Sequence, residues 1–235
     1  FFYSLRENRS EERPPDVGPN SPWWENYLEV SNYIKRVCAL LSHTHNTAKI
    51  AVLCCEDHVS WQVTKPLYQN QIEFNYLDKA FLKNCKIENG KLKIKKQEYS
   101  VLLLDVDISF DKTMLQILKE FSCSGGTVIK FKNQGSAYIL PEKTEDNIVQ
   151  SLKDYAYDDI RFLGNTNHLR ITRIINEKNV YFILFNEGNE NLELAIDSEI
   201  SKEILLIDLW KNDNRRLKNK SKFNMEGSQL LILCY

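Results

Sequence analysis

The first clear pattern along the chain is a set of apolar residues at helical spacing near its start. These residues lie three or four positions apart, which is the period of one face of an α-helix. They are Trp23, Tyr27, Val30, Ile34, Val37 and Leu41. Ser21 stands where an N-cap belongs and Pro22 at the first helical position, so the pattern predicts a helix over residues 22–42. Its apolar face is broad for a helix that covers one small domain, and we expect it to contact two bodies.

From residue 48 the pattern alternates between short apolar runs and amphipathic segments. Four segments predict strands of a parallel sheet. Ala48–Cys55 is a continuous apolar run, which is typical of a buried parallel strand, and the others are Gln71–Leu77, Ser100–Leu104 and Thr127–Phe131. The other segments predict helices at Pro66–Asn70, Asp78–Leu82, Asp111–Phe121 and Asp146–Tyr155. Asn89-Gly90 predicts the type I′ turn of a hairpin. This order predicts an α/β fold, a flavodoxin-like doubly wound parallel sheet that with the first helix spans residues 22–158.

After residue 158 the helical period disappears and short apolar runs follow one another closely. They predict strands, separated by polar turns, at Leu169–Ile175, Val180–Phe185, Leu192–Ile196, Ile204–Leu209 and Leu230–Cys234. Residues 159–235 are therefore predicted to form an antiparallel, β-sandwich-like sheet. Residues 1–21 show no period and are rich in proline, so we expect a loop there.

The charge balance and hydropathy exclude two classes of partner. The chain has 235 residues, with 31 lysines and arginines against 32 acidic residues, and a formal net charge of −1. A protein that binds nucleic acid needs a basic surface, which this balance does not supply. No apolar run reaches the roughly 18 residues that a membrane span requires. We therefore expect neither a nucleic-acid partner nor a membrane partner.

The cysteines and histidines give no sign of a metal or redox site. Six cysteines and four histidines are present, without a Cys-x-x-Cys pair or metal-ligand spacing, so we expect no metal and no cofactor. Most of the cysteines lie in apolar runs, which predicts free, buried thiols. Free thiols are more frequent in a reducing compartment such as the cytoplasm, but no feature of the sequence fixes the compartment.

Two places carry residue types that could act chemically. Asp105 and Asp107 follow a predicted parallel strand, at the edge where doubly wound folds bind ligands. A turn with a helix cap is the more common use of such residues, and it is the favoured interpretation. The segment after Cys55 contains no glycine that would admit a pyrophosphate, which argues against dinucleotide binding. His58 is close to Cys55 in the sequence, but no residue of the sequence is recognisable as the group that would orient it, so a nucleophilic pair is not expected.

The aromatic pair Trp23 and Trp24 opens the first predicted helix. Such a pair can stack on a sugar ring at the edge of a cleft. Aromatic residues at a helix start more often pack against a neighbouring domain, and we favour packing.

The opening of the chain also resembles a known family. Arg13-Pro14-Pro15-Asp16-Val17-Gly18 and Asn20-Ser21-Pro22-Trp23-Trp24 are similar to the segment that leaves the catalytic barrel in large α-L-rhamnosidase-like glycoside hydrolases. Ala48–Leu53 and Gly125–Ile129 resemble strands of the flavodoxin-like domain that follows there, which is similar to an inactive glutamine amidotransferase domain. Val180–Ile183 resembles the start of the next domain, a β-sandwich.

This resemblance implies that the chain is a C-terminal piece of a glycoside hydrolase whose catalytic acid and base lie on barrel strands outside it. No residue of the chain then has a catalytic role. Residues 1–21 are the implied loop remnant of the barrel, with Arg13 and Asp16 as implied substrate-binding residues beside Trp23 and Trp24. The implied partners are a carbohydrate, bound through the intact parent enzyme, and the upstream barrel, against which the chain packs.

Three functions stay open on the sequence. The first is a non-catalytic C-terminal accessory portion of a rhamnosidase-like glycoside hydrolase, inactive by itself. The second is a stand-alone flavodoxin-like module that binds a small ligand near Asp105 and Glu56. The third is a carbohydrate-binding or structural accessory protein whose β-rich part holds the sugar.

Overall fold

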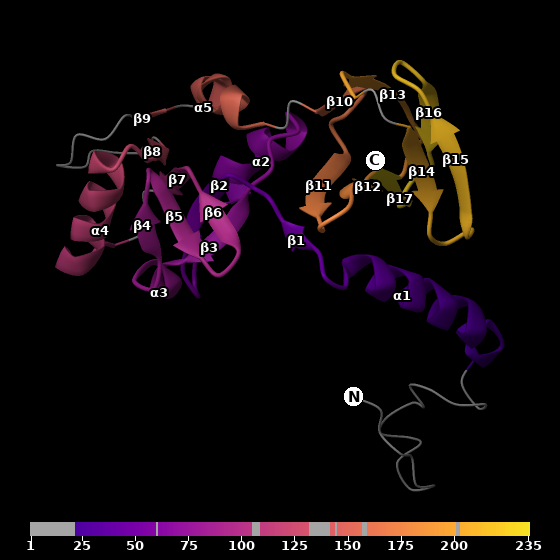
Figure 1. The fold of residues 1–235 in the computed structure, drawn as a ribbon, viewed down its shortest axis with the longest axis horizontal. Helices are drawn as coiled ribbons and strands as arrows, with labels where there is room; N and C mark the ends of the chain where they lie inside the picture. Colours follow the sequence, from indigo (N-terminus) through magenta and orange to yellow (C-terminus); the bar gives the residue numbers. More distant parts are fainter. Residues whose placement is uncertain are drawn as a thin grey trace, which may run out of the picture.

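The computed structural model describes residues 22–59, 61–104, 109–131, 142–143, 145–156, 159–200 and 203–235. Figure 1 shows two bodies side by side, with a long helix beside the second. We call residues 48–156 the α/β part and residues 159–235 the β part. The expected loop over residues 1–21, and the N-cap at Ser21, lie outside the described residues.

The α/β part is built on a parallel sheet with the strand order β3-β2-β7-β8-β9. Its strands are β2 (Ile50–Cys54), β3 (Asn75–Asp78), β7 (Val101–Leu104), β8 (Thr127–Phe131) and β9 (Glu142–Lys143). Every residue of β2 and β7 is buried, as expected for central strands covered on both faces. The parallel sheet that the apolar runs predict is therefore confirmed.

Helices cover both faces of this sheet. On one face lie α2 (Trp61–Gln69) and α5 (Glu145–Leu152), which is followed by the short 3-10 helix η3 (Lys153–Tyr155). On the other lie α3 (Lys79–Leu82) and α4 (Lys112–Cys123), together with a small sheet of β4 (Lys86–Glu88), β5 (Lys91–Ile94) and β6 (Gln97–Tyr99). Asn89 and Gly90 have φ of 51° and 71°, which confirms the predicted hairpin turn between β4 and β5.

The β part consists of two antiparallel sheets that share one hydrophobic core. The larger sheet has the order β1-β11-β12-β17-β14-β15 and the smaller has the order β10-β13-β16. The strands are β10 (Ile160–Gly164), β11 (Leu169–Ile175), β12 (Val180–Asn186), β13 (Leu192–Ser198), β14 (Ile204–Asp208), β15 (Asp213–Leu217), β16 (Lys222–Met225) and β17 (Leu230–Cys234). Antiparallel structure in this half of the chain is therefore confirmed.

A strand from outside the β part completes its larger sheet. β1 (His45–Asn46) belongs to the segment that leads into the α/β part, and it pairs with the end of β11 at Ile174 and Ile175. The chain therefore joins the sheet of the β part before it enters the α/β part (Figure 1).

The first helix is shorter than the sequence predicts. A 3-10 turn, η2 (Trp24–Asn26), precedes α1 (Tyr27–Leu41), and no residue of α1 is buried. The short helix expected at Pro66 is also different, because α2 begins at Trp61 and carries Pro66 in its interior. No helix among the described residues is long and apolar enough to cross a membrane.

The cysteines differ from the expectation in one respect. All six are free, as predicted, but only Cys54 and Cys234 are buried. Cys38 on α1 and Cys123 at the end of α4 are exposed. For Cys38, apolar neighbours in sequence therefore do not imply burial, whereas Cys123 stands between two serines.

Candidate functional site

The carboxyl ends of the parallel strands form the first candidate site. The chain runs from β2 outward to β3 in one direction and to β7 in the other, which is the switch point where doubly wound folds place ligands. A cavity of about 670 Å³ lies there, and Glu56, Asp78, Lys83 and Asp111 are among the residues that line it. Asp105 and Asp107 lie outside the described residues.

Two of the acidic residues in this cavity are occupied by helix capping. Asp78 Oδ1 accepts a hydrogen bond of 2.7 Å from the N–H of Ala80, at the start of α3. Asp111 Oδ1 accepts one of 2.8 Å from the N–H of Met114, at the start of α4. The ammonium of Lys83, 2.7 Å from Asp111, lowers the pKa of that carboxyl group. Asp111 is therefore a capping anion rather than a general acid.

The cysteines beside this cavity lack the features of a nucleophilic site. Cys55 and His58 bond through their backbones, each N–H donating to the carbonyl of the other at 3.0 Å. Burial, helped by the nearby Asp78, raises the pKa of the Cys54 thiol. A raised pKa keeps the thiol protonated, and the thiolate is the nucleophile. In the described part of the chain, no group of His, Cys, Asp or Glu residues could hold a metal ion.

The tryptophans predicted as binding residues lie at the start of α1. The ring of Trp24 stacks on Tyr27 at 5.0 Å between centroids, and that of Trp23 lies 5.8 Å from the same ring. Both side chains remain more than a third exposed, at 39% for Trp23 and 37% for Trp24. Arg13 and Asp16 lie outside the described residues.

Helix α1 contacts the β part through one turn. Arg36 Nε donates to the carbonyl of Leu209 at 2.6 Å and its Nη2 donates to that of Trp210 at 3.2 Å. The ring of Tyr33 meets the ring of Trp210 edge to face at 5.1 Å. Large apolar side chains of the helix remain exposed, namely Leu28 (70%), Ile34 (53%) and Leu41 (46%). Within the described residues, the broad apolar face of α1 is therefore largely uncovered.

A polar network joins the two parts of the molecule around Asn46 and Arg173. Asn46 Nδ2 donates to Glu73 at 2.5 Å, and Glu73 accepts the backbone N–H of Arg173 at 3.2 Å. The guanidinium of Arg173 pairs with Asp159 at 3.0 Å and donates to Thr47 Oγ1, also at 3.0 Å. These bonds connect the segment around β1, the α/β part and the β part.

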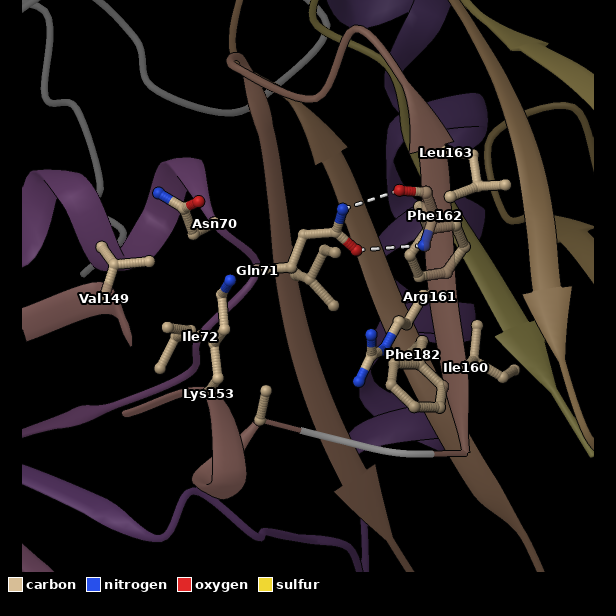
Figure 2. A pocket seen from close by; sticks show the side chains of 12 residues that line it. Asn70, Gln71, Ile72, Val149, Lys153, Ile160, Arg161, Phe162, Leu163 and Phe182 are labelled. Atoms are coloured by element: carbon tan, nitrogen blue, oxygen red, sulfur yellow. Dashed lines mark hydrogen bonds between the residues drawn. The ribbon is translucent and has the colours of Figure 1, made fainter. Parts of the chain in front are cut away.

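A second cavity, of about 240 Å³, lies at this junction. Figure 2 shows it between the end of α2, the η3 helix and strand β10. Gln71 crosses beside it and binds the backbone of Phe162, while Lys153 and Arg161 reach toward the same space from opposite walls. Its described polar lining residues are Asn70, Gln71, Lys153 and Arg161, and no described acidic residue lines it.

The junction cavity is not indicated by any pattern in the sequence. Asn70 and Gln71 follow α2, while Lys153 and Arg161 come from elements much later in the chain. No motif or spacing connects them. The only local signal is the polar pair Asn70-Gln71 at a helix end, which is ordinary turn composition.

No protein-family model matches the chain, and a comparison with curated protein sequences finds no relative. Several solved structures with a similar fold are glycoside hydrolases. The rhamnosidase from Novosphingobium sp. PP1Y matches 91% of this chain with a TM-score of 0.68 at 14% sequence identity. Gan42B, a GH42 beta-galactosidase from G. stearothermophilus, matches 93% with a TM-score of 0.62 at 9% identity. The alpha-L-fucosidase isoenzyme 2 from Paenibacillus thiaminolyticus matches 89% with a TM-score of 0.53 at 11% identity.

The matched regions are only a part of those enzymes. The chain covers 25% of the rhamnosidase, 44% of the beta-galactosidase and 51% of the fucosidase. At identities this low the likeness concerns the fold. It extends over the α/β part and the β part together, because each match covers about nine tenths of this chain.

Proposed function

We propose that the chain is a non-catalytic accessory region of a rhamnosidase-like glycoside hydrolase. One observation carries the proposal, namely the match of 91% of the chain to a quarter of a rhamnosidase. A match of that extent includes the two parts in the same order and arrangement, which is more specific than the likeness of either part alone. The larger cavity supports the same conclusion, since two of its acidic residues, Asp78 and Asp111, cap helices and burial raises the pKa of the neighbouring Cys54 thiol.

The domain organisation belongs to this proposal. We divide the chain into a loop over residues 1–21, a helix with a flavodoxin-like domain over residues 22–158, and a β-sandwich domain over residues 159–235. If the five parallel strands are renumbered 1 to 5 along the chain, the sheet order β3-β2-β7-β8-β9 becomes 2-1-3-4-5. This is the order of flavodoxin-like sheets. The shared core of the two antiparallel sheets supports the sandwich.

The catalytic domain of the same enzyme is the proposed partner of α1. Trp23, Trp24 and Leu28 form an apolar surface at the start of the helix that the described residues leave exposed. A soluble protein covers such a surface when it is part of an interface. Under this proposal the tryptophans pack against the barrel, and Arg13 and Asp16 stay candidates for contact with the sugar.

Activity assays test the proposal. The purified chain is incubated with aryl α-L-rhamnoside, β-galactoside and α-L-fucoside, the sugars that the names of the similar enzymes suggest. We expect no turnover above that of a heat-denatured sample, because the acid and base are supplied elsewhere. Sustained hydrolysis of any of these glycosides by the chain would contradict the proposal.

The coding sequence provides a second test. We expect the reading frame to include barrel strands that carry two carboxylates, about 5–9 Å apart in the folded enzyme. In that intact enzyme, Leu28→Ser should lower the thermal midpoint, whereas Glu29→Ser, on the neighbouring position, should leave it nearly unchanged. A reading frame without such strands would contradict the proposal.

A second candidate function is a small-ligand module. The cavity of about 670 Å³ at the switch point favours it, because that volume suits a nucleotide or flavin. A fluorescence titration of the chain with FMN and nucleotides distinguishes the two candidates. Saturable binding would favour the module, and an unchanged signal would favour the accessory role.

A further inference from the structure

We infer that the junction cavity binds an acidic monosaccharide, a single sugar ring that carries one carboxylate, sulfate or phosphate group. The inference goes beyond the accessory role, because the cavity is formed by this chain alone. It rests on the charge, the size and the shape of the space between the end of α2, η3 and β10.

Charge is the first argument. Lys153 and Arg161 line the cavity, and no described residue that lines it is acidic. Neither cation forms an ion pair among the described residues, although Asp197 stands opposite Arg161 in the β10–β13 ladder. In Figure 2 the guanidinium of Arg161 and the ammonium of Lys153 both point into the space between the walls. Two cations that face one cavity favour an anion, and a guanidinium suits a planar oxyanion.

Size is the second argument. The cavity volume of about 240 Å³ lies just below the roughly 300–1,000 Å³ of sites for drug-sized ligands. It therefore fits one small ring rather than an oligosaccharide or a nucleotide.

The walls give the third argument, because they combine apolar and polar side chains. Ile72, Val149 and Ile171 supply an apolar surface of the kind that packs against the face of a sugar ring. Asn70 lies near Val149 on one wall (Figure 2), and its Nδ2 donates to the carbonyl of Pro66 at 2.8 Å. That bond fixes the amide, and its Oδ1 is then available to accept from a hydroxyl group.

The cavity is held in shape without its two cations. Gln71 holds β10 against the end of α2 through Phe162, and neither Lys153 nor Arg161 takes part in those bonds. Both cations are exposed residues, so replacing them by methionine keeps the aliphatic stem and removes only the charge. A test by substitution is therefore possible without unfolding the protein.

The test is isothermal titration calorimetry of the complete 235-residue chain with D-glucuronate, glucose 6-phosphate and D-glucose. We expect one of the two acidic sugars, or both, to bind at one site, and glucose to bind at least tenfold more weakly. The two acidic sugars distinguish a carboxylate from a phosphate. Lys153→Met and Arg161→Met should each weaken binding roughly tenfold, and added salt should weaken it in the wild type.

Matched controls are Lys178→Met and Arg215→Met, which remove exposed cations elsewhere in the β part. They should bind as the wild type does. The inference is wrong if glucose binds as tightly as the acidic sugars, if neither acidic sugar binds, or if the cavity variants bind no more weakly than the controls.

Discussion

The carboxamide of Gln71 binds both sides of the peptide backbone at Phe162. Its Nε2 donates to the carbonyl oxygen at 2.7 Å, and its Oε1 accepts from the N–H at 3.0 Å. Strand β10 pairs with β13 on one side only, so Gln71 takes the place of one residue of a neighbouring strand on the other side. A single side chain of the α/β part thus provides hydrogen-bond partners for the backbone N–H and carbonyl of Phe162, on the edge strand of the β part.

Removing this contact should loosen the junction. Gln71→Leu keeps the approximate size of the side chain but leaves the N–H and the carbonyl of Phe162 unpaired, at a cost of roughly 1–3 kcal/mol. Chemical denaturation should show the loss, and the amide of Phe162 should exchange its hydrogen faster. Gln116→Leu is the control, because among the described residues that amide bonds only to Glu120 on the surface of α4. Equal exchange at Phe162 in the two variants would refute the prediction.

Arg36 should hold α1 on the β part. Arg36→Met removes the bonds to the carbonyls of Leu209 and Trp210, and we expect a loss of about 1 kcal/mol together with faster amide exchange along α1. Lys35→Met, at the neighbouring exposed position, should change neither quantity. If both variants exchange alike, the helix is held by other contacts.

Gly126 should tolerate no side chain. A Cβ atom there would lie 2.1 Å from Cε2 of Phe121, a ring that is fully buried at the end of α4. Gly126→Ala should therefore cost about 1–3 kcal/mol in the free energy of unfolding. Phe121→Leu makes space, so the double variant should lose less than the sum of the two single losses. Strictly additive losses would mean that the clash is relieved in another way.

Asn186 should be essential to the turns at one end of the β part. It is fully buried, donates to the carbonyls of Glu190 and Glu226 at 2.8 and 2.9 Å, and accepts from the N–H of Gly188 at 3.1 Å. Asn186→Ala leaves these three groups unpaired, and thermal unfolding should show a loss of about 3 kcal/mol. Asn224→Ala, on an exposed position of β16, should change the stability by less than about 0.5 kcal/mol.

Because of Tyr235, the stability of the protein should depend on pH in the alkaline range. Burial and its hydrogen bond to Asp159 raise the pKa of the phenol to about 12. The unfolded chain therefore loses this proton near pH 10 while the folded chain retains it, so stability is unaffected below pH 10 and falls between about 10 and 12.

A titration followed by tyrosinate absorbance measures this directly. Tyr235→Phe should remove the ionisation step at the highest pH and reduce the fall in stability above pH 10. Tyr33→Phe should leave that step in place. Persistence of the step in Tyr235→Phe would assign it to another tyrosine.

The sequence predicts those elements whose burial is periodic or whose ends carry local chemistry. The strands β2 and β7 are continuous apolar runs because a parallel sheet is covered on both faces. Asp78 and Asp111 cap helices within three residues of their own position, and the turn at Asn89-Gly90 depends on those two residues alone. Interactions this local are visible in a single sequence.

Other elements depend on residues far away in the chain. Strand β15 has four exposed polar residues in a row, a composition that the sequence pattern assigns to the polar turns between strands, because an edge strand needs no apolar alternation. Gln71 and Phe162 are partners across 91 positions, and the cations of the junction cavity come from still other elements. Nothing in the local pattern indicates which of these side chains meet.

The pairing of His45 and Asn46 with β11 has a consequence for how the protein is made. These two residues leave the ribosome before the whole α/β part, whereas their partners Ile174 and Ile175 follow it. The α/β part is therefore synthesised after the first strand of this pair and before the second. While the α/β part is being made, β1 is attached to it without its partner strand. The backbone hydrogen bonds of β1 can form only after β11 has left the ribosome.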